Sequence, residues 1–356
     1  MILKNRYCCG VHVMWYEFKM FPEYIESCHQ MLLEVENREN VTFHFCFNLQ
    51  EYLEKIDWDK MHEIYGYDLP YKFRSVETRP AHDSDFRNFW WNLFEKIWGN
   101  GLFWGKGQPL AKVRVDIKTD NDEFYNIADY RRDLNNDWCR KTEYVMWGET
   151  DSLWPKETLE VVESISQIAE NSPKHVISFA DRKMWDSSWD KLCHPLFESQ
   201  QFQDNDNWTL NNEASGKSYM TLDRMNEINS KSDGVEIHTF NEPKFDGSCL
   251  VISSELIKSG VNIPHSLLLA GEDTAFMEMC KTVLGNNYVQ YHVKNILHVH
   301  NRRHPNKRTG ILNETNPNGF CDDRKGKWWI DLENASKFNL ANLKTQVKFK
   351  TINTIL

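Results

Sequence analysis

Two different patterns of apolar and polar residues occupy the first fifty positions of this chain. Residues 11–18 and 41–47 are nearly continuous apolar runs, rich in the aromatic and β-branched side chains that are typical of strands. Between them, through residues 22–36, apolar side chains recur every three or four positions behind an initial proline, as in an amphipathic helix. This order predicts a βαβ unit with parallel strands, and such sheets bind ligands at the carboxyl ends of their strands.

Similar patterns continue along most of the chain. Further strands are predicted at residues 111–118, 144–148, 175–180, 245–254, 288–292 and 296–300. Further helices are predicted at residues 50–64, 83–98, 123–134, 155–170 and 255–259, and from residue 272 onward. Strands that alternate with helices predict an α/β fold, with a mixed, mainly parallel central sheet flanked by helices.

Two segments depart from this alternation. Residues 181–244 are polar and contain few apolar periods, so we expect an insertion that forms one wall of a site. Residues 306–356 are expected to form a polar C-terminal extension.

Composition narrows the class of protein. The 356 residues are 40% hydrophobic and 26% charged, which is the balance of a soluble globular protein. No apolar run approaches the length of roughly 18 residues that a membrane span needs, and charged residues interrupt the start of the chain where a signal peptide would be apolar. The nine cysteines are odd in number and form no Cys-x-x-Cys pair, which favours reduced thiols. We therefore expect a cytoplasmic protein that does not bind membranes.

The most informative polar residues follow the predicted strand at residues 144–148. Glu149 and Asp151 stand directly after this apolar run, with one residue between them. Two carboxylates in one turn can both bind a hard divalent cation, which prefers oxygen ligands and can itself hold phosphates. The alternative is an ordinary helix N-terminus, in which Asp151 or Ser152 caps the following helix.

Two further polar clusters stand at the ends of predicted elements. Glu272 and Asp273 begin a predicted helix, where carboxylates would also suit the helix dipole without any catalytic role. His298 and His300 lie on the last predicted strand, and each is equally interpreted as a hydrogen-bonded strand residue.

Two arginines occupy the helix predicted at residues 123–134. Arg131 lies on its apolar side, next to Arg132, and an arginine in such a position is usually either paired or extended toward water. A salt bridge that supports the fold and a contact with a phosphate are both compatible with this placement.

In this order, the motifs resemble those of nucleotide-sugar glycosyltransferases of the GT-A fold. The first strand runs into Trp15-Tyr-Glu17, and the helix after it carries Glu23-Tyr-Ile-Glu-Ser27. The second strand ends at Asn48, and Ile127-Ala-Asp-Tyr-Arg131 matches the helix that precedes the metal motif. Glu149-Thr-Asp151 stands at the Asp-x-Asp metal motif, from which it departs at its first position. Gly271-Glu-Asp273 and a downstream histidine complete the pattern, which spans residues 10–305.

The resemblance implies a metal-dependent transfer of a sugar from a nucleotide-diphosphate donor, expected to be a UDP-sugar. Residues 1–155 would form the nucleotide-sugar-binding half of one GT-A (Rossmann-like) domain and residues 156–305 the acceptor half. The implied donor contacts are Trp15, Glu17, Asn48, Arg131, Arg132, Trp147 and Arg303.

The resemblance also assigns the chemistry. Asp151 and Glu149, with His300 or His298, would bind Mn²⁺ or Mg²⁺, and a histidine ligand favours Mn²⁺. The cation would stabilise the charge on the leaving phosphate. An acceptor hydroxyl needs a base, and the implied base is Asp273, with Glu272 beside it.

The start of the chain is also similar to cytosolic glycosyltransferases of tailed bacteriophages, some of which modify hydroxymethylated pyrimidines in DNA. This implies double-stranded DNA as the acceptor, its backbone docking at the cationic run of residues 302–308, although that run is equally interpreted as a solvated loop. The net charge of −10 argues against nonspecific binding of nucleic acid. Two alternatives stay open: a surface glycan or lipid-linked sugar as the acceptor, and a non-catalytic sugar-binding module that uses some of the 14 tryptophans.

Overall fold

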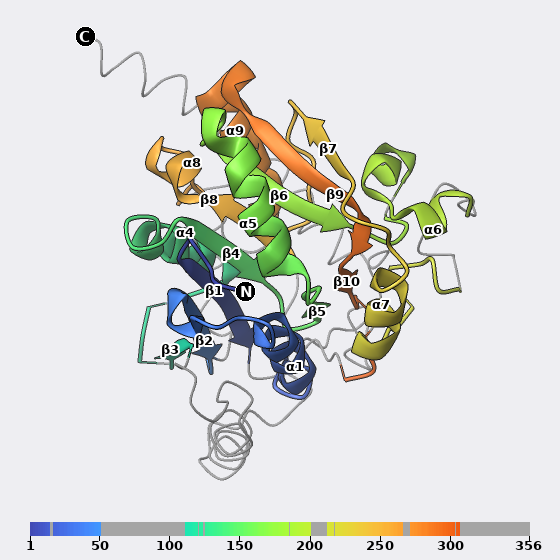
Figure 1. Cartoon of the computed structure of the whole chain (residues 1–356). Helices are drawn as coiled ribbons and strands as arrows, with labels where there is room; N and C mark the ends of the chain where they lie inside the picture. The colour runs from blue at the N-terminus through green and yellow to red at the C-terminus, as the bar shows by residue number, and fades with distance from the viewer. Residues whose placement is uncertain are drawn as a thin grey trace, which may run out of the picture.

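One eight-stranded sheet forms the centre of the molecule (Figure 1). The computed structural model describes residues 1–14, 17–50, 111–119, 121–123, 125–184, 186–200, 212–216, 218–265, 271–302 and 304–306. The strands of the sheet are β1 (Tyr7–Met14), β2 (Val41–Asn48), β3 (Lys112–Lys118), β4 (Tyr144–Gly148), β6 (His175–Ala180), β7 (Ile237–Phe240), β8 (Leu250–Ser253) and β9 (Val289–Leu297). Their order is β3-β2-β1-β4-β8-β6-β9-β7.

The sheet is mixed. The strands from β3 to β4 run parallel to one another, β8 is antiparallel to both of its neighbours, and β9 is parallel to β6 but antiparallel to β7. The predicted α/β class with a mixed, helix-flanked central sheet is therefore confirmed. The proposed division at residue 155 stays a prediction, and strands from both sides of it belong to this one sheet.

Helices cover both faces of the sheet. The longer ones are α1 (Phe21–Leu32), α4 (Ile127–Trp138), α5 (Thr158–Ile168), α7 (Leu222–Asn229) and α9 (Glu272–Leu284), and the short ones are α6 (Pro195–Glu198), α8 (Ser254–Lys258), η2 (Arg38–Asn40), η4 (Ala169–Asn171), η5 (Ser187–Leu192) and η7 (Gly285–Asn287). α1 and α5 contribute to one hydrophobic cluster, whereas α4, α8 and α9 contribute to a second. Along β4, Met146 joins the first cluster and Trp147 the second, because successive strand residues point to opposite faces.

The predicted βαβ unit is present at the start of the chain. β1 and β2 are parallel, with Tyr7 opposite Val41, and α1 connects them. All residues of both strands are buried, as expected for parallel strands covered on both faces. β1 begins earlier than predicted because the buried pair Cys8 and Cys9 extends the apolar run to the other side of Gly10, and it ends at Met14, before residues 15 and 16, which lie outside the described residues.

The polar segment of residues 181–244 contains more regular structure than its composition indicates. β7 pairs antiparallel with β9 and forms the edge of the main sheet. α7 buries Met225 and Ile228 in a third hydrophobic cluster, which also contains Val299. Both elements are short, and β7 is partly exposed, so neither produces a long apolar pattern.

Several expectations fall on residues that the structure does not describe. The helices predicted at residues 50–64 and 83–98 fall almost entirely within residues 51–110, and nearly the whole C-terminal extension falls within residues 307–356; both ranges lie outside the described residues.

The two short strands predicted at residues 288–292 and 296–300 are arranged differently. β9 is one continuous strand, and β10 (Val299–His300) follows it in a second sheet. β10 pairs antiparallel with β5 (Ser152–Leu153), which places His300 opposite Ser152. This short sheet brings the end of β9 to the turn that follows β4.

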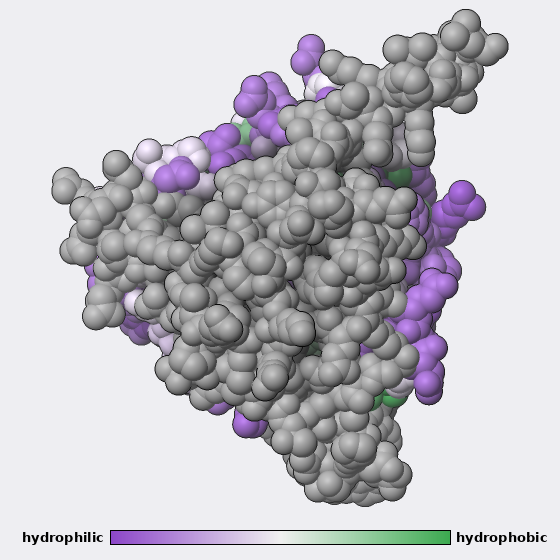
Figure 2. Space-filling model, turned by 180° about the vertical axis from the view of Figure 1, so that it is seen from behind, coloured by the Kyte–Doolittle hydropathy of each residue, from purple (hydrophilic) through white to green (hydrophobic). Residues whose placement is uncertain are grey.

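Exposed apolar side chains are spread over separate elements of the described chain. The large ones are Ile2, Leu33, Ile117, Ile168, Leu196, Tyr219, Val235 and Val283. On the face seen in Figure 2, the described residues that reach the surface are mainly hydrophilic. Within the described part of the chain, no helix combines the length and the apolar character needed to cross a membrane.

A contact between α1 and the end of β4 gives a test of this packing. A Cβ atom at Gly148 would lie 2.3 Å from the hydroxyl oxygen of Tyr24. We expect Gly148→Ala to lower the free energy of unfolding by about 1–3 kcal/mol, because overpacking forces the helix or strand to move. Urea unfolding measures the loss, and adding Tyr24→Phe, which removes the nearest atom, should recover part of it. A Gly148→Ala variant as stable as the wild type would contradict the contact.

Candidate metal centre and active site

The candidate site begins at the tight turn that ends β4. The backbone N–H of Ser152 donates to the carbonyl oxygen of Glu149 at 3.0 Å, and the Ser152 hydroxyl accepts from the Glu149 backbone N–H at 3.0 Å. The turn leads directly into β5, so Asp151 is not part of a helix N-terminus. The carboxylates of Glu149 and Asp151 therefore stand at the carboxyl end of a central strand, as the βαβ topology predicts for a ligand site.

His300 joins these two carboxylates through the pairing of β5 with β10. Its Nε2 atom lies 3.1 Å from Glu149 Oε2 and 3.5 Å from Asp151 Oδ1. One ligand atom from each of the three residues lies within 4.8 Å of the others. Two carboxylates and one imidazole at this separation fit a divalent cation such as Mn²⁺ or Mg²⁺.

Opposite charges hold the three side chains together. Burial alone would lower the pKa of His300, but the carboxylates of Asp151 and Asp246 outweigh it and raise that pKa well above its usual value. Burial would likewise raise the pKa of Glu149, but His300 and Arg131 lower it. The cluster therefore favours ionised carboxylates, the state that binds a cation, together with a protonated His300, whose Nε2 proton a bound cation would displace.

Arg131 connects this cluster to the start of α9. Its guanidinium, only 1% exposed, donates to Glu149 Oε1 at 2.7 Å, to Glu272 Oε1 at 2.6 Å and to the carbonyl oxygen of Gly247 at 2.8 Å. It also lies 4.8 Å from the centre of the Trp147 ring. Both terminal nitrogens bind protein oxygens, which favours the structural interpretation of Arg131 over a contact with the diphosphate.

Glu272 and Asp273 stand at the first turn of α9, behind Gly271, whose φ of 82° is left-handed. Burial raises the pKa of Glu272 to about 7, even though Arg131 acts in the opposite direction. Burial also raises the pKa of Asp273, whose Oδ1 accepts from the backbone N–H of Thr274 at 2.6 Å. Glu272 forms an ion pair with Arg131, whereas Asp273 is only partly buried. Asp273 is therefore the better placed of the two to contact a substrate.

The second candidate histidine has different partners. His298 Nε2 lies 3.1 Å from Asp181 Oδ1 and 3.2 Å from the hydroxyl oxygen of Ser248. Burial lowers the pKa of His298 to about 4. Of the two histidines, His300 is the one that the structure brings to Glu149.

Two of the residues expected to bind the sugar donor form hydrogen bonds within the protein instead. The Asn48 amide donates to the carbonyl oxygen of Tyr125 at 2.6 Å, and its oxygen accepts from the backbone N–H of Gln50 at 2.9 Å, which fixes the end of β2. Trp147 is fully buried, and its indole N–H donates to Asn135 Oδ1 at 2.9 Å.

The remaining expected donor contacts are placed as follows. Arg132 forms an ion pair with Asp129 on its own helix, and Glu17 Oε2 accepts from the backbone N–H of Met14 at 3.3 Å. Trp15 and Arg303 lie outside the described residues.

One residue at the site received no role from the sequence. The carboxylate of Asp246 lies 3.3 Å from His300 Nδ1 and pairs with Arg302. Asp246 falls within the strand predicted at residues 245–254, but β8 begins only at Leu250, and Asp246 and Gly247 lie before it. An Asp-Gly pair is also typical of an ordinary turn. Asp246 could have been identified only by its contact with His300, and that contact depends on the tertiary structure.

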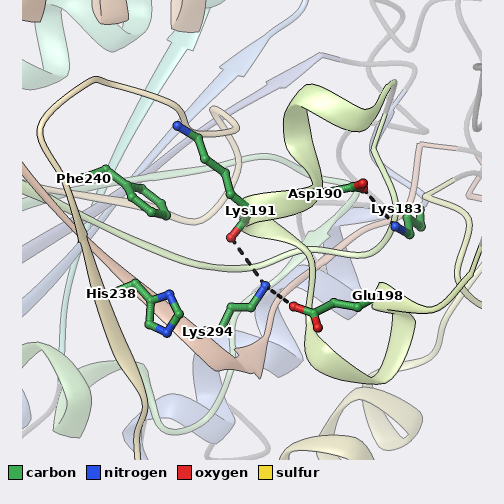
Figure 3. A pocket seen from close by; sticks show the side chains of 7 residues that line it. All are labelled: Lys183, Asp190, Lys191, Glu198, His238, Phe240 and Lys294. Atoms are coloured by element: carbon green, nitrogen blue, oxygen red, sulfur yellow. Dashed lines mark hydrogen bonds and ion pairs between the residues drawn. The ribbon is translucent and has the colours of Figure 1, made fainter.

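A separate pocket of about 420 Å³ lies between β7, β9 and the segment that contains η5 and α6 (Figure 3). Its lining residues are Lys183, Asp190, Lys191, Glu198, His238, Phe240 and Lys294. Lys183 pairs with Asp190 at 2.9 Å and Lys294 with Glu198 at 2.6 Å, so two of its three ammonium groups are already neutralised. It contains none of the predicted site residues.

Three solved structures are distantly similar to this chain. No protein-family model and no curated protein matches the chain. Among solved structures, S. aureus TarS 1–349 matches with 11% identity and a TM-score of 0.36, over 81% of this chain and 60% of that chain. Its complex with UDP-GlcNAc matches with 10% identity and a TM-score of 0.34, over 81% and 58%. GalNAc-T7 with UDP, GalNAc and Mn²⁺ matches with 9% identity and a TM-score of 0.40, over 83% and 44%.

This chain therefore covers less than two thirds of each of these three chains. With TM-scores this low, the function has to be inferred from the residues of the site.

The buried ion pairs of Arg131 lead to a stability prediction. We expect Arg131→Ala to lower the free energy of unfolding by about 3–5 kcal/mol, because it removes the buried cation that pairs with Glu272 and, together with His300, with Glu149. Chemical denaturation measures this. Arg6→Ala is the matched control, since Arg6 pairs with Glu143 while their side chains are 56% and 43% exposed, and its loss should stay below about 1 kcal/mol. Similar losses in both variants would contradict a special role for Arg131.

Proposed function

We propose that this protein is a metal-dependent glycosyltransferase that moves a sugar from a nucleotide-diphosphate donor, in our proposal a UDP-sugar, to an acceptor hydroxyl. The observation that carries the proposal is the gathering of Glu149, Asp151 and His300 within 4.8 Å at the carboxyl end of β4. The order of motifs along the chain, which resembles the GT-A glycosyltransferases, supports the same conclusion. We extend the proposal to the two halves of the fold, with donor binding in residues 1–155 and acceptor binding in residues 156–305.

The metal ligands suit the breaking of a sugar–diphosphate bond. That reaction places negative charge on the leaving phosphate, and a bound Mn²⁺ or Mg²⁺ supplies Lewis-acid stabilisation of this charge. Asp151, Glu149 and His300 would hold the cation, and the imidazole favours Mn²⁺. Glu149 replaces the first Asp of the family motif; its longer side chain reaches both His300 and Arg131.

Asp273 is the proposed general base. The pKa of an acceptor hydroxyl lies far above neutrality, so its attack needs a carboxylate that takes the proton as the new bond forms. Asp273 is partly exposed, and burial raises its pKa, which makes the ionised carboxylate a stronger base. Glu272, held by Arg131, would fix the first turn of α9 and so orient Asp273. A base in this role implies inversion at the anomeric carbon.

The acceptor that we propose is a 5-hydroxymethylpyrimidine base in DNA, by resemblance to the bacteriophage glycosyltransferases. Within the described residues, the cationic run that suggested DNA is partly internal: Arg302 pairs with the buried Asp246, and His304 with Glu23. Contact with DNA would therefore have to come from the rest of the run, including Arg303, Lys307 and Arg308, which lie outside the described residues.

Release of UDP tests the proposed reaction. With Mn²⁺ and a panel of UDP-sugars, the wild type should release UDP, and Asp151→Ala should reduce the rate by about 100-fold or more, since metal stabilisation is worth several kcal/mol. Asp190→Ala, which changes a carboxylate of the separate pocket, serves as the control and should keep the wild-type rate. Equal rates in wild type and Asp151→Ala would remove the metal assignment. Absence of turnover with every nucleotide sugar would instead favour a sugar-binding module.

Transfer of a labelled sugar tests the acceptor. Duplex DNA that contains 5-hydroxymethylcytosine should become labelled, whereas the same duplex with unmodified cytosine should not, because only the former offers the hydroxymethyl group. If neither duplex is labelled while the donor is still hydrolysed, the DNA acceptor is wrong and a glycan or lipid-linked sugar takes its place.

A further inference from the structure

The turn Asp246–Gly247–Ser248, which Cys249 separates from β8, contacts both His300 and Arg131. The carboxylate of Asp246 faces His300, while the carbonyl oxygen of Gly247 accepts from Arg131, which in turn holds Glu149. One short turn therefore contacts the candidate ligand His300 directly and the candidate ligand Glu149 through Arg131.

The contact with His300 determines which ring nitrogen faces the carboxylates of the cluster. Asp246 Oδ2 lies 3.3 Å from His300 Nδ1, on the side of the ring opposite to Nε2. A carboxylate at this position accepts a hydrogen bond from Nδ1–H, so a neutral imidazole has its lone pair on Nε2. Nε2 is the nitrogen that lies 3.1 Å from Glu149 and 3.5 Å from Asp151.

Asp246 is itself held in place from two other directions. Its Oδ1 accepts from the backbone N–H of Ser248 at 2.7 Å, and its Oδ2 pairs with the guanidinium of Arg302. Its side chain is only 4% exposed. A carboxylate fixed by a backbone amide and a buried cation has one direction in which to face the imidazole.

The middle of the turn has no space for a side chain. A Cβ atom at Gly247 would lie 2.6 Å from Arg131 Nη1 and 3.1 Å from the Cβ of Asp273. Glycine lets the turn approach the guanidinium closely enough for its carbonyl oxygen to accept the hydrogen bond. The close approach also places the turn against the residue that we propose as the base.

We propose that Asp246 is a positioning residue that fixes the ring orientation and the tautomer of His300, and thereby strengthens metal binding at Glu149, Asp151 and His300. The proposal rests on the metal site of the proposed function. Carboxylates that accept from the second nitrogen of a metal-bound histidine orient that ligand, and their loss typically weakens metal binding about 10–100-fold.

Titration of the full-length chain with Mn²⁺ alone, followed by calorimetry, tests the role of Asp246 without any substrate. Asp246→Ala should weaken Mn²⁺ binding about 10–100-fold, and Asp246→Asn should lie between it and the wild type, because the amide oxygen can still accept from His300. In a His300→Ala background, Asp246→Ala should cause almost no further loss, since the residue acts through that histidine. Unchanged affinity in Asp246→Ala, or a full additional loss in the double variant, would overturn the proposal.

Glu163→Ala is the matched control. Glu163 is another buried carboxylate, 7% exposed, which lies on α5 and accepts from the Tyr7 hydroxyl at 2.7 Å and from the backbone N–H of Asn5 at 2.9 Å. Its removal should leave the Mn²⁺ affinity within about threefold of the wild type, as expected for a residue whose partners belong to a different part of the fold. A loss equal to that of Asp246→Ala would show a general effect of removing buried charge, and would contradict the proposal.

Two further outcomes are decisive. If Asp246→Ala does not fold, as judged by circular dichroism, Asp246→Asn decides: its amide cannot accept from all three partners of the carboxylate, so weaker Mn²⁺ binding supports the proposal and wild-type affinity overturns it. If the wild type itself does not bind Mn²⁺, the metal site of the proposed function is wrong. Wild-type binding that is unaffected by Asp246→Ala refutes the role of Asp246 alone.

Discussion

A guanidinium removed from water must be paired, and this requirement organises the candidate site around Arg131. Its positive charge is fully buried, so it holds carboxylates from two separate elements: Glu149, after β4, and Glu272, at the start of α9. The first of these also carries Asp151, so it supplies two of the three candidate metal ligands, and the second supplies the candidate base. The proposed metal site and base are therefore kept in one geometry by Arg131, whose terminal nitrogens both donate to protein oxygens.

The site is completed by hydrogen bonds that run between distant parts of the chain. The backbone N–H of Asn301 donates to the carbonyl oxygen of Asp151 at 2.7 Å, directly beside the pairing of β5 with β10. The Asn301 amide then bonds the backbone of Met220, just before α7. A polar segment that looked like an insertion thus helps to secure the strand that carries His300.

Much of the fold could be predicted because it depends on long apolar patterns. The βαβ unit and β6 follow from runs of buried residues, whereas β7 is too short and too exposed to produce one. At the site, the order of motifs brought Glu149, Asp151 and His300 into one hypothesis, and they lie together. The sequence could not indicate that Asn48 and Trp147 would be occupied by internal hydrogen bonds, or that Asp246 faces His300, because such partners are set by tertiary contacts between residues far apart in the chain.

The pairing of β5 with β10 also bears on how the protein is made. Ser152 and His300 pair although about two fifths of the chain lies between them, and closing so large a loop costs entropy before the contact is gained. During synthesis, a ribosome-bound chain that ends before His300 can already contain the βαβ unit, yet it lacks one of the three candidate ligands. The complete set of three candidate ligands can therefore form only after His300 has been synthesised.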